Sequence, residues 1–178
     1  LPVAMAIIAA LDTPLGDSEN GFAIALLLSM ASAASLGDAI AVPVDVTDDR
    51  SIAEALAKTE KDLAAPDILV ASAGITGPNM TVDKYPVDAW KQVIDINLTG
   101  VFLCNRAVVP GMVKRGWGRV VFISSESGLH IPAEMVHYGM TKSAQLSVAR
   151  GLAETCAGTA VTGNSVAVSV VTNRSAFS

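Results

Sequence analysis

The chain has 178 residues, enough for one domain that buries a core without disulfides or metal. Its formal net charge of −5 argues against nucleic acid or an anionic lipid surface as the main partner, because both need clustered Lys and Arg. Apolar residues make up 51% of the chain and aromatic residues only 4%, so the core must consist mainly of Ala, Val, Ile and Leu. We therefore expect a small-molecule substrate, and no nucleic acid or membrane partner.

Neither the apolar amino terminus nor the cysteines indicate a special site. The run from Leu1 to Leu11 has no basic leader and is shorter than the roughly 20 residues of a membrane span. We interpret it as a buried first strand and, without targeting signals, expect a cytoplasmic protein. Cys104 and Cys156 lack a CxxC spacing or a His-rich neighbourhood, which predicts core positions rather than a disulfide or a metal site.

Strand-like and helix-like segments alternate along the chain. Strands are predicted over Val3–Ala10, Ala39–Val44, Asp67–Ser72, Arg119–Ser124 and Val161–Val168. Helices are predicted over Ser51–Leu63, Val87–Arg115 and Tyr138–Cys156. This alternation is typical of an α/β fold with a doubly wound, mostly parallel, Rossmann-like sheet and helices on both faces. Pro43 cannot donate to a ladder, which predicts that its strand lies at an edge.

Several polar residues occur where open α/β folds place their ligands. Ser125 follows a predicted strand and therefore lies at the carboxyl edge of the sheet. Tyr138 and Lys142 are one helical turn apart on one face, although this spacing alone is also common on solvated helices. Asn97 is a polar residue in an apolar helical stretch, where a satisfied core amide is the alternative interpretation. The small residues of Ser72-Ala73-Gly74 offer a surface for a flat ligand.

The tyrosine and the lysine together can move a proton. A free tyrosine has a pKa of about 10, and a nearby ammonium group favours the phenolate. We predict that Tyr138 takes a proton from an alcohol or gives one to an alkoxide, and that Ser125 hydrogen-bonds the same oxygen. His137 is expected to point off another face of the helix, and we assign it no catalytic role.

These motifs, taken in order from about Asp45 to Val168, resemble the short-chain dehydrogenase/reductase family. Ala71-Ser72-Ala73-Gly74 stands where the family has Asn-Asn-Ala-Gly. Asp45-Val46 resembles an acidic pair that contacts the adenine of the cofactor. The catalytic tetrad of the family is matched by Asn97, Ser125, Tyr138 and Lys142.

The resemblance implies an NAD(P)-dependent oxidoreductase that interconverts an alcohol and a carbonyl on a sugar, a hydroxyacyl group or a similar small substrate. It implies one dinucleotide-binding and catalytic domain over residues 1–178. It also implies that Lys142 binds the nicotinamide ribose, that Asn97 holds a water linking Lys142 to solvent, and that Tyr138 adjoins the cofactor. Copies of the chain are expected to pair through the long helices into homodimers or homotetramers.

The amino-terminal third departs from the family pattern, which opens with Thr-Gly-x-x-x-Gly-x-Gly at a helix N-terminus. If Gly21 is the last of these glycines, Leu15 and Glu19 occupy the other two positions and Gly16 is one residue out of register. A carboxylate there would repel a pyrophosphate. Gly16 and Gly21 are still the candidates for this part of cofactor binding, and the segment from Gly21 to Leu26 is expected to run into the helix.

A second departure is that only eight residues separate Leu28 from Gly37, where the family has a strand that selects NAD or NADP. A third is that no Pro-Gly turn follows Val168. We hypothesise that segments of a longer chain are absent near 28–35 and near 168–170. The alternative to absent segments is a truly shortened or rearranged gene product. The alternative function, which the discordant glycine motif favours, is a catalytically silent binding or assembly module. A third possibility keeps the cofactor but changes the reaction, as epimerases and dehydratases with the same Tyr-x-x-x-Lys do, although those relatives have larger substrate domains. The sequence leaves open the substrate, the direction of the reaction and the choice between NAD and NADP.

Overall fold

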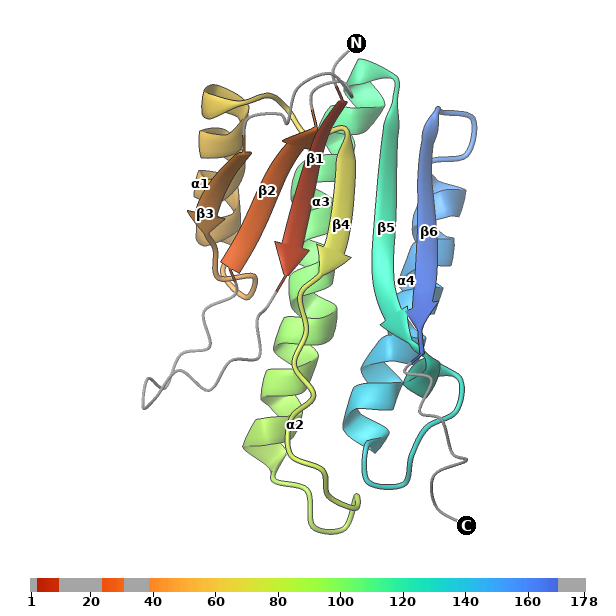
Figure 1. Ribbon diagram of the computed structural model, residues 1–178. Coiled ribbons are helices and arrows are strands. Elements are labelled where there is room, and N and C mark those ends of the chain that lie inside the picture. Colours follow the sequence, from red (N-terminus) through yellow and green to blue (C-terminus); the bar gives the residue numbers. More distant parts are fainter. Residues whose placement is uncertain (1–2, 10–23, 31–38, 170–178) are drawn as a thin grey trace, which may run out of the picture.

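The computed structural model describes the backbone of residues 3–9, 24–30 and 39–169, and the side chains of residues 40–169. Six strands form one sheet in the order β3-β2-β1-β4-β5-β6 (Figure 1). The strands are β1 (Val3–Ala9), β2 (Ile24–Met30), β3 (Ala39–Pro43), β4 (Ile68–Ser72), β5 (Gly118–Ser125) and β6 (Val161–Val168). The five predicted strands are therefore confirmed, and Pro43 lies on an edge strand as predicted.

Strand β2 is the element that the sequence did not predict. It pairs antiparallel with both β1 and β3, so it alone runs against the other strands and the sheet is mostly parallel. The prediction that Gly21 to Leu26 leads into a helix is wrong for the described part, since the strand begins at Ile24. A short, continuous apolar run has no period that distinguishes a strand from a helix. Of the hypothesised absent segments, 28–35 and 168–170, residues 31–35 and 170 lie outside the described residues.

Within residues 39–169, four helices and two short helical turns connect the strands. They are α1 (Asp49–Asp62), α2 (Val87–Ile94), the π-helical turn η1 (Asp95–Gly100), α3 (Val101–Arg115), the 3-10 turn η2 (Glu126–Gly128) and α4 (Val136–Thr155). The predicted helix over 87–115 is confirmed as one continuous run, with η1 in its middle. This run is long and apolar enough to cross a membrane by length and composition alone, but α3 packs on β4 and β5.

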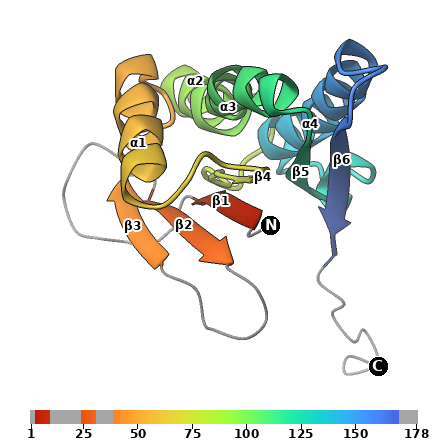
Figure 2. The ribbon, with the colours of Figure 1, turned by 90° about the horizontal axis from the view of Figure 1, so that it is seen from above.

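The described helices all cover one face of the sheet (Figure 2). The connections from β3 through β4 and β5 to β6 all step in the same direction along the sheet. Because such crossovers are right-handed, they place their helices on the same side. The predicted second layer of helices is not found among the described residues, because β2 joins its neighbours without a described crossover helix.

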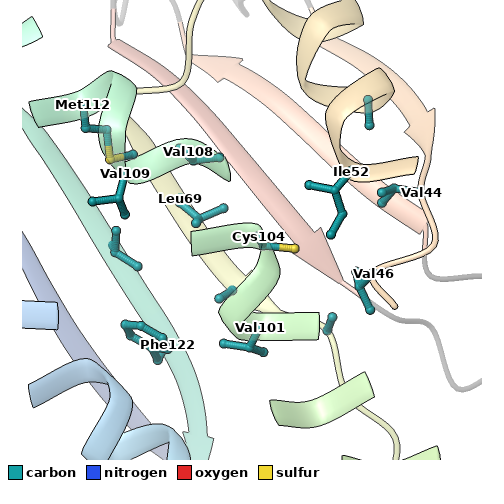
Figure 3. Close-up of a cluster of buried hydrophobic side chains, with 14 of the residues drawn as sticks. Val44, Val46, Ile52, Leu69, Val101, Cys104, Val108, Val109, Met112 and Phe122 are labelled. Atoms are coloured by element: carbon teal, nitrogen blue, oxygen red, sulfur yellow. The ribbon is translucent and has the colours of Figure 1, made fainter. Parts of the chain in front are cut away.

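The core lies between the helices and the central strands (Figure 3). One face of α3 presents Val101, Cys104, Val108 and Met112 towards the sheet, and all four are buried. They pack in one cluster with residues of the strands such as Phe122. Cys104 and Cys156 are both buried and free, as predicted.

Helix α4 approaches the segment after β5 very closely because a glycine, Gly139, lies in its first turn. A Cβ atom built on Gly139 would lie 2.6 Å from the carbonyl oxygen of Ser127 and 2.7 Å from the Ile131 side chain. On the opposite side of this contact, a Cβ atom on Gly128 would lie 2.9 Å from the Lys142 carbonyl carbon. Glycine on both elements therefore allows the segment after β5 to lie directly against α4.

The packing predicts opposite effects for two alanine substitutions in the same helix. Gly139→Ala should lower the free energy of unfolding by about 1–3 kcal/mol, because the contact is with backbone and must shift. Gly151→Ala is the matched control: no atom lies within 4 Å of its added Cβ, so helix propensity should stabilise the protein by about 0.5–1 kcal/mol. Urea unfolding measures both. Equal stability of the two variants would contradict the close approach.

Candidate active site

A cleft of about 330 Å³ opens at the carboxyl ends of β4 and β5. In a parallel sheet these ends meet at one edge, which is where open α/β folds bind ligands. The cleft brings together the predicted site residues Ser125, Tyr138 and Lys142. It also includes Ser72, the last residue of β4, and Gly74 just after that strand. The remaining lining residues are Ile75, Thr76, Ile123, Ser124 and Val168.

Lys142 reaches the cleft from within the protein. Its residue is only 4% exposed, and its Nζ donates to the carbonyl oxygen of Ile123 at 2.8 Å and to Oε1 of Gln145 at 3.3 Å. The same Nζ lies over the Tyr138 ring, 5.5 Å from its centroid. Burial disfavours the charged ammonium and lowers the pKa of Lys142 to about 8. A buried cation is thus held beside the half-buried tyrosine.

Ser125 and Ser124 fix the end of β5 in different ways. The Oγ of Ser125 accepts a hydrogen bond from the backbone N–H of Ser127 at 3.2 Å and caps η2. The Oγ of the buried Ser124 donates to the carbonyl oxygen of Lys142 at 2.9 Å. Both serines therefore line the cleft, and Ser124 also ties the backbone of Lys142 to the same strand end.

Asn97 does not line the cleft but lies behind it, completely buried on η1. Its Oδ1 accepts from the N–H of Ile75 at 2.7 Å, and its Nδ2 donates to the Ile75 carbonyl at 2.8 Å and to Thr141 Oγ1 at 3.2 Å. The Asn97 amide therefore both accepts from and donates to the backbone of Ile75, as the backbone of a neighbouring strand does. π-Helical turns often occur at functional sites, and this one aims the amide at the segment after β4.

The predicted cofactor residues differ in where the structure places them. Ser72 and Gly74 line the cleft, and Ala73 between them is buried. Asp45 and Val46 follow β3 and do not line it: Oδ1 of Asp45 accepts from the N–H and Oγ1 of Thr47. Val46 is buried against Gly100, where an added Cβ would lie 2.7 Å from its Cγ2. Gly16 and Gly21 lie outside the described residues.

His137 is buried and points away from the cleft, as predicted. Its Nε2 lies 2.8 Å from the carbonyl oxygen of Thr76, to which it must donate, and its ring stacks on Tyr85 with centroids 3.9 Å apart. Burial raises the pKa of Tyr85. His137 therefore holds the loop that carries Thr76 without entering the cleft itself. In residues 40–169 no group of three His, Cys, Asp or Glu is arranged to hold a metal.

Gln145 is the site residue that sequence reasoning missed. It is completely buried on α4, and its Nε2 donates to the carbonyl oxygen of Asn97 at 2.7 Å while its Oε1 faces Lys142. The available signal was its spacing: three residues after Lys142, it lies on the same helical face as that lysine. This spacing makes Gln145 a candidate contact of the predicted catalytic lysine, but only the structure identifies its hydrogen-bond partners.

Comparison with known proteins identifies the family of the chain. Residues 19–176 match the family model described as short chain dehydrogenase. The chain therefore belongs to the short-chain dehydrogenase/reductase family, and its Rossmann-like fold is that of the family.

The relatives include dehydrogenases and reductases. A 2-dehydro-3-deoxy-L-rhamnonate dehydrogenase (NAD(+)) from Sphingomonas is 37% identical over 147 residues, covering 83% of this chain and 57% of the relative. A 3-oxoacyl-[acyl-carrier-protein] reductase from Synechocystis is 34% identical, covering 74% of this chain and 53% of the relative. The chain thus spans about half the length of the curated relatives it matches.

Among solved structures, serine dehydrogenase complexed with NADP+ has a TM-score of 0.66 at 34% identity, covering 68% of this chain and 49% of that one. NAD+-bound xylitol dehydrogenase has a TM-score of 0.68 at 29% identity, covering 70% of this chain and 48% of that one.

The buried ammonium predicts a pH-dependent contribution to stability. The pKa of Lys142 is about 8 when folded, against a reference of 10.5, so the penalty for burying its charge is present below about pH 8 and is lost towards pH 10.5. Between about pH 7 and pH 11 the wild type should gain up to about 3 kcal/mol of unfolding free energy relative to Lys142→Met.

Urea unfolding across this pH range measures the difference between the two proteins. Lys91→Met removes a lysine whose side chain is 67% exposed and serves as the control. A wild-type-minus-Lys142→Met difference that stays constant with pH would show that the ammonium is solvated in the folded protein.

Proposed function

We propose that the protein is an NAD(P)-dependent oxidoreductase that interconverts an alcohol and a carbonyl. The observation that carries the proposal is that Ser125, Tyr138 and Lys142 line one cleft, with Ser72 and Gly74 beside them. Independent support comes from relatives that are named as a dehydrogenase and a reductase. Because the chain spans about half of their length, the activity of the whole protein is part of the proposal.

The cleft suits the nicotinamide and ribose end of a dinucleotide. Gly74 leaves open the space beside Lys142, because a Cβ there would lie 3.3 Å from Asn97 Oδ1 and 3.5 Å from Lys142 Nζ. In our proposal the Lys142 ammonium donates to the ribose hydroxyls, while Ser72 and Gly74 lie against the ring. Hydride transfer is the chemistry that a bound nicotinamide dinucleotide supplies. Solved relatives contain NAD+ in one case and NADP+ in another, so both are proposed.

The proton transfer belongs to the chain's own residues. In oxidation, the Tyr138 oxygen takes the proton of the substrate hydroxyl, and in reduction it returns one to the developing alkoxide. Ser125 donates a hydrogen bond to the same substrate oxygen and fixes its position. The Lys142 ammonium, held over the tyrosine ring, favours the negative charge that forms on the phenolic oxygen. We propose that Asn97 supports this relay through its backbone carbonyl.

The substrate class follows from the names of the relatives and is proposed at that level. One acts on a deoxy sugar acid and another on an acyl-carrier-bound oxoacyl group. A small oxo or hydroxy compound of the sugar-acid or acyl type is the proposed substrate.

We also propose that copies of the protein associate with one another. Phe102 is 51% exposed and Val113 is 40% exposed on the long helix, and exposed apolar surface can mark a protein–protein contact. Pairing of this helix with a second copy would cover both. We propose a homodimer or homotetramer on this basis and on the family resemblance, and the cytoplasmic location stays a prediction from the sequence.

Replacing each of the two tyrosines tests the mechanism. Tyr138→Phe should lower kcat by about 10²-fold or more, because the variant cannot exchange the proton. Its affinity for the cofactor should stay nearly unchanged. Tyr85→Phe is the matched control, since Tyr85 lies outside the cleft, and it should keep most of the activity. Turnover of Tyr138→Phe at the wild-type rate would refute the proposed role of Tyr138.

A binding experiment separates the proposal from the alternative of a catalytically silent module. The discordant Leu15 and Glu19 in the expected glycine turn are the observation that favours the alternative. Titration with NADH and NADPH, followed by nicotinamide fluorescence, should give a saturable change with at least one of them. A response to neither would favour the silent module.

A further inference from the structure

Gln145 connects the two groups on which the proposed proton relay depends. Both ends of its amide are engaged: Nε2 donates to the carbonyl oxygen of Asn97 at 2.7 Å, and Oε1 accepts from the Lys142 ammonium at 3.3 Å. The side chain is completely buried. It therefore forms a bridge from η1 to α4 that lies behind the cleft.

The chemistry of its partners fixes the orientation of the amide. An ammonium group can only donate and a carbonyl can only accept, so the oxygen must face Lys142 and the nitrogen must face Asn97. A carboxylate at this position would offer no donor to the carbonyl, and an aliphatic side chain would satisfy neither partner. Among side chains of this length, a primary amide is the one that serves both while remaining uncharged.

We propose that Gln145 is a positioning residue for the reaction, which holds the Lys142 ammonium at a fixed separation from the Asn97 carbonyl. Together with the carbonyl of Ile123, it occupies two of the three donors of the ammonium. The third donor remains for the cleft. Gln145 thus sets the direction in which Lys142 presents its charge. The catalytic consequence rests on the proposed function, whereas the geometric role does not.

No charged group among the described residues neutralises Lys142. Charged side chains on the elements packed against α4 are Arg119 on β5, Glu126 on η2, Asp95 on η1, and Asp88 and Lys91 on α2, and none forms an ion pair with Lys142. On α4 itself, His137 is directed at Thr76, and Tyr138 is the titratable neighbour over which Nζ lies. A change of charge at position 145 should therefore act directly on the ammonium.

Two variants of similar size should shift the titration of Lys142 in opposite directions. Gln145→Glu keeps an acceptor and adds a negative charge, which favours the ammonium and should raise the pKa of Lys142 by about one unit or more. Gln145→Met removes the acceptor and should lower it. The control is Asn105→Leu, because Asn105 is a buried helical amide that bonds only its own helix, and it should leave Lys142 unchanged.

The titration is read from the Cε resonance of Lys142 by ¹³C NMR of lysine-labelled protein, with Lys142→Met used to assign the signal. Circular dichroism identifies any variant that fails to fold. If Gln145→Met does not fold, the rise in the pKa of Lys142 in Gln145→Glu alone tests the positioning role. Shifts of less than about half a unit in every folded variant would overturn the positioning role.

The pH profile of kcat provides the catalytic test. In the oxidation of an alcohol, the apparent pKa in the kcat profile that reports Lys142 should shift in the same direction as the pKa measured by NMR. The KM for the cofactor should change little. An NMR shift without a shifted profile in an active enzyme would overturn the link to catalysis. If the chain binds no cofactor and turns over no substrate, the proposed function fails, and the NMR titration still decides the geometric role of Gln145.

Discussion

The burial of one ammonium group organises this site. Lys142 carries a positive charge into the protein and pairs with no carboxylate in residues 40–169, and a buried charge must be hydrogen-bonded to be tolerated. Its bond to the Ile123 carbonyl fastens α4 to β5, and Gln145, which accepts its other bond, fastens α4 to η1 through the Asn97 carbonyl. Because Tyr138 lies one turn earlier on α4, the same bonds also fix the tyrosine relative to Ser125. The proton-transfer groups are thus held on packed elements rather than on a flexible loop.

The rest of the local structure allows that burial. Gly139 and Gly128 let α4 and η2 approach closely, so the end of β5 reaches the lysine. Asn97 pairs with the backbone of Ile75 and holds the segment after β4 against the same helix. The cleft is therefore bounded by three elements that share a network of backbone and amide hydrogen bonds. Loss of one of these hydrogen bonds should weaken the others, because they share residues.

Much of this arrangement could be predicted from the sequence, and the failures have physical causes. Ser125, Tyr138 and Lys142 follow from a strand end and a helical spacing, which are local, and the structure brings them together in one cleft. Asn97 was recognised as a polar residue in an apolar helix, but its partners depend on a π-helical turn that no periodicity reveals. Gln145 was missed because its role depends on contacts distant in sequence. Strand β2 was missed because an unbroken apolar run suits a strand or a helix equally.

The central claim is that Tyr138, Lys142 and the small residues after β4 form the nicotinamide end of a dinucleotide site. The most direct test is a titration of lysine-labelled protein with NADH and NADPH, in which the Lys142 resonance and the nicotinamide fluorescence are followed together. The account predicts that the Lys142 signal shifts and saturates at the same concentration as the fluorescence with at least one of the two cofactors. Saturating fluorescence with an unmoved Lys142 signal would place the cofactor elsewhere and contradict the account.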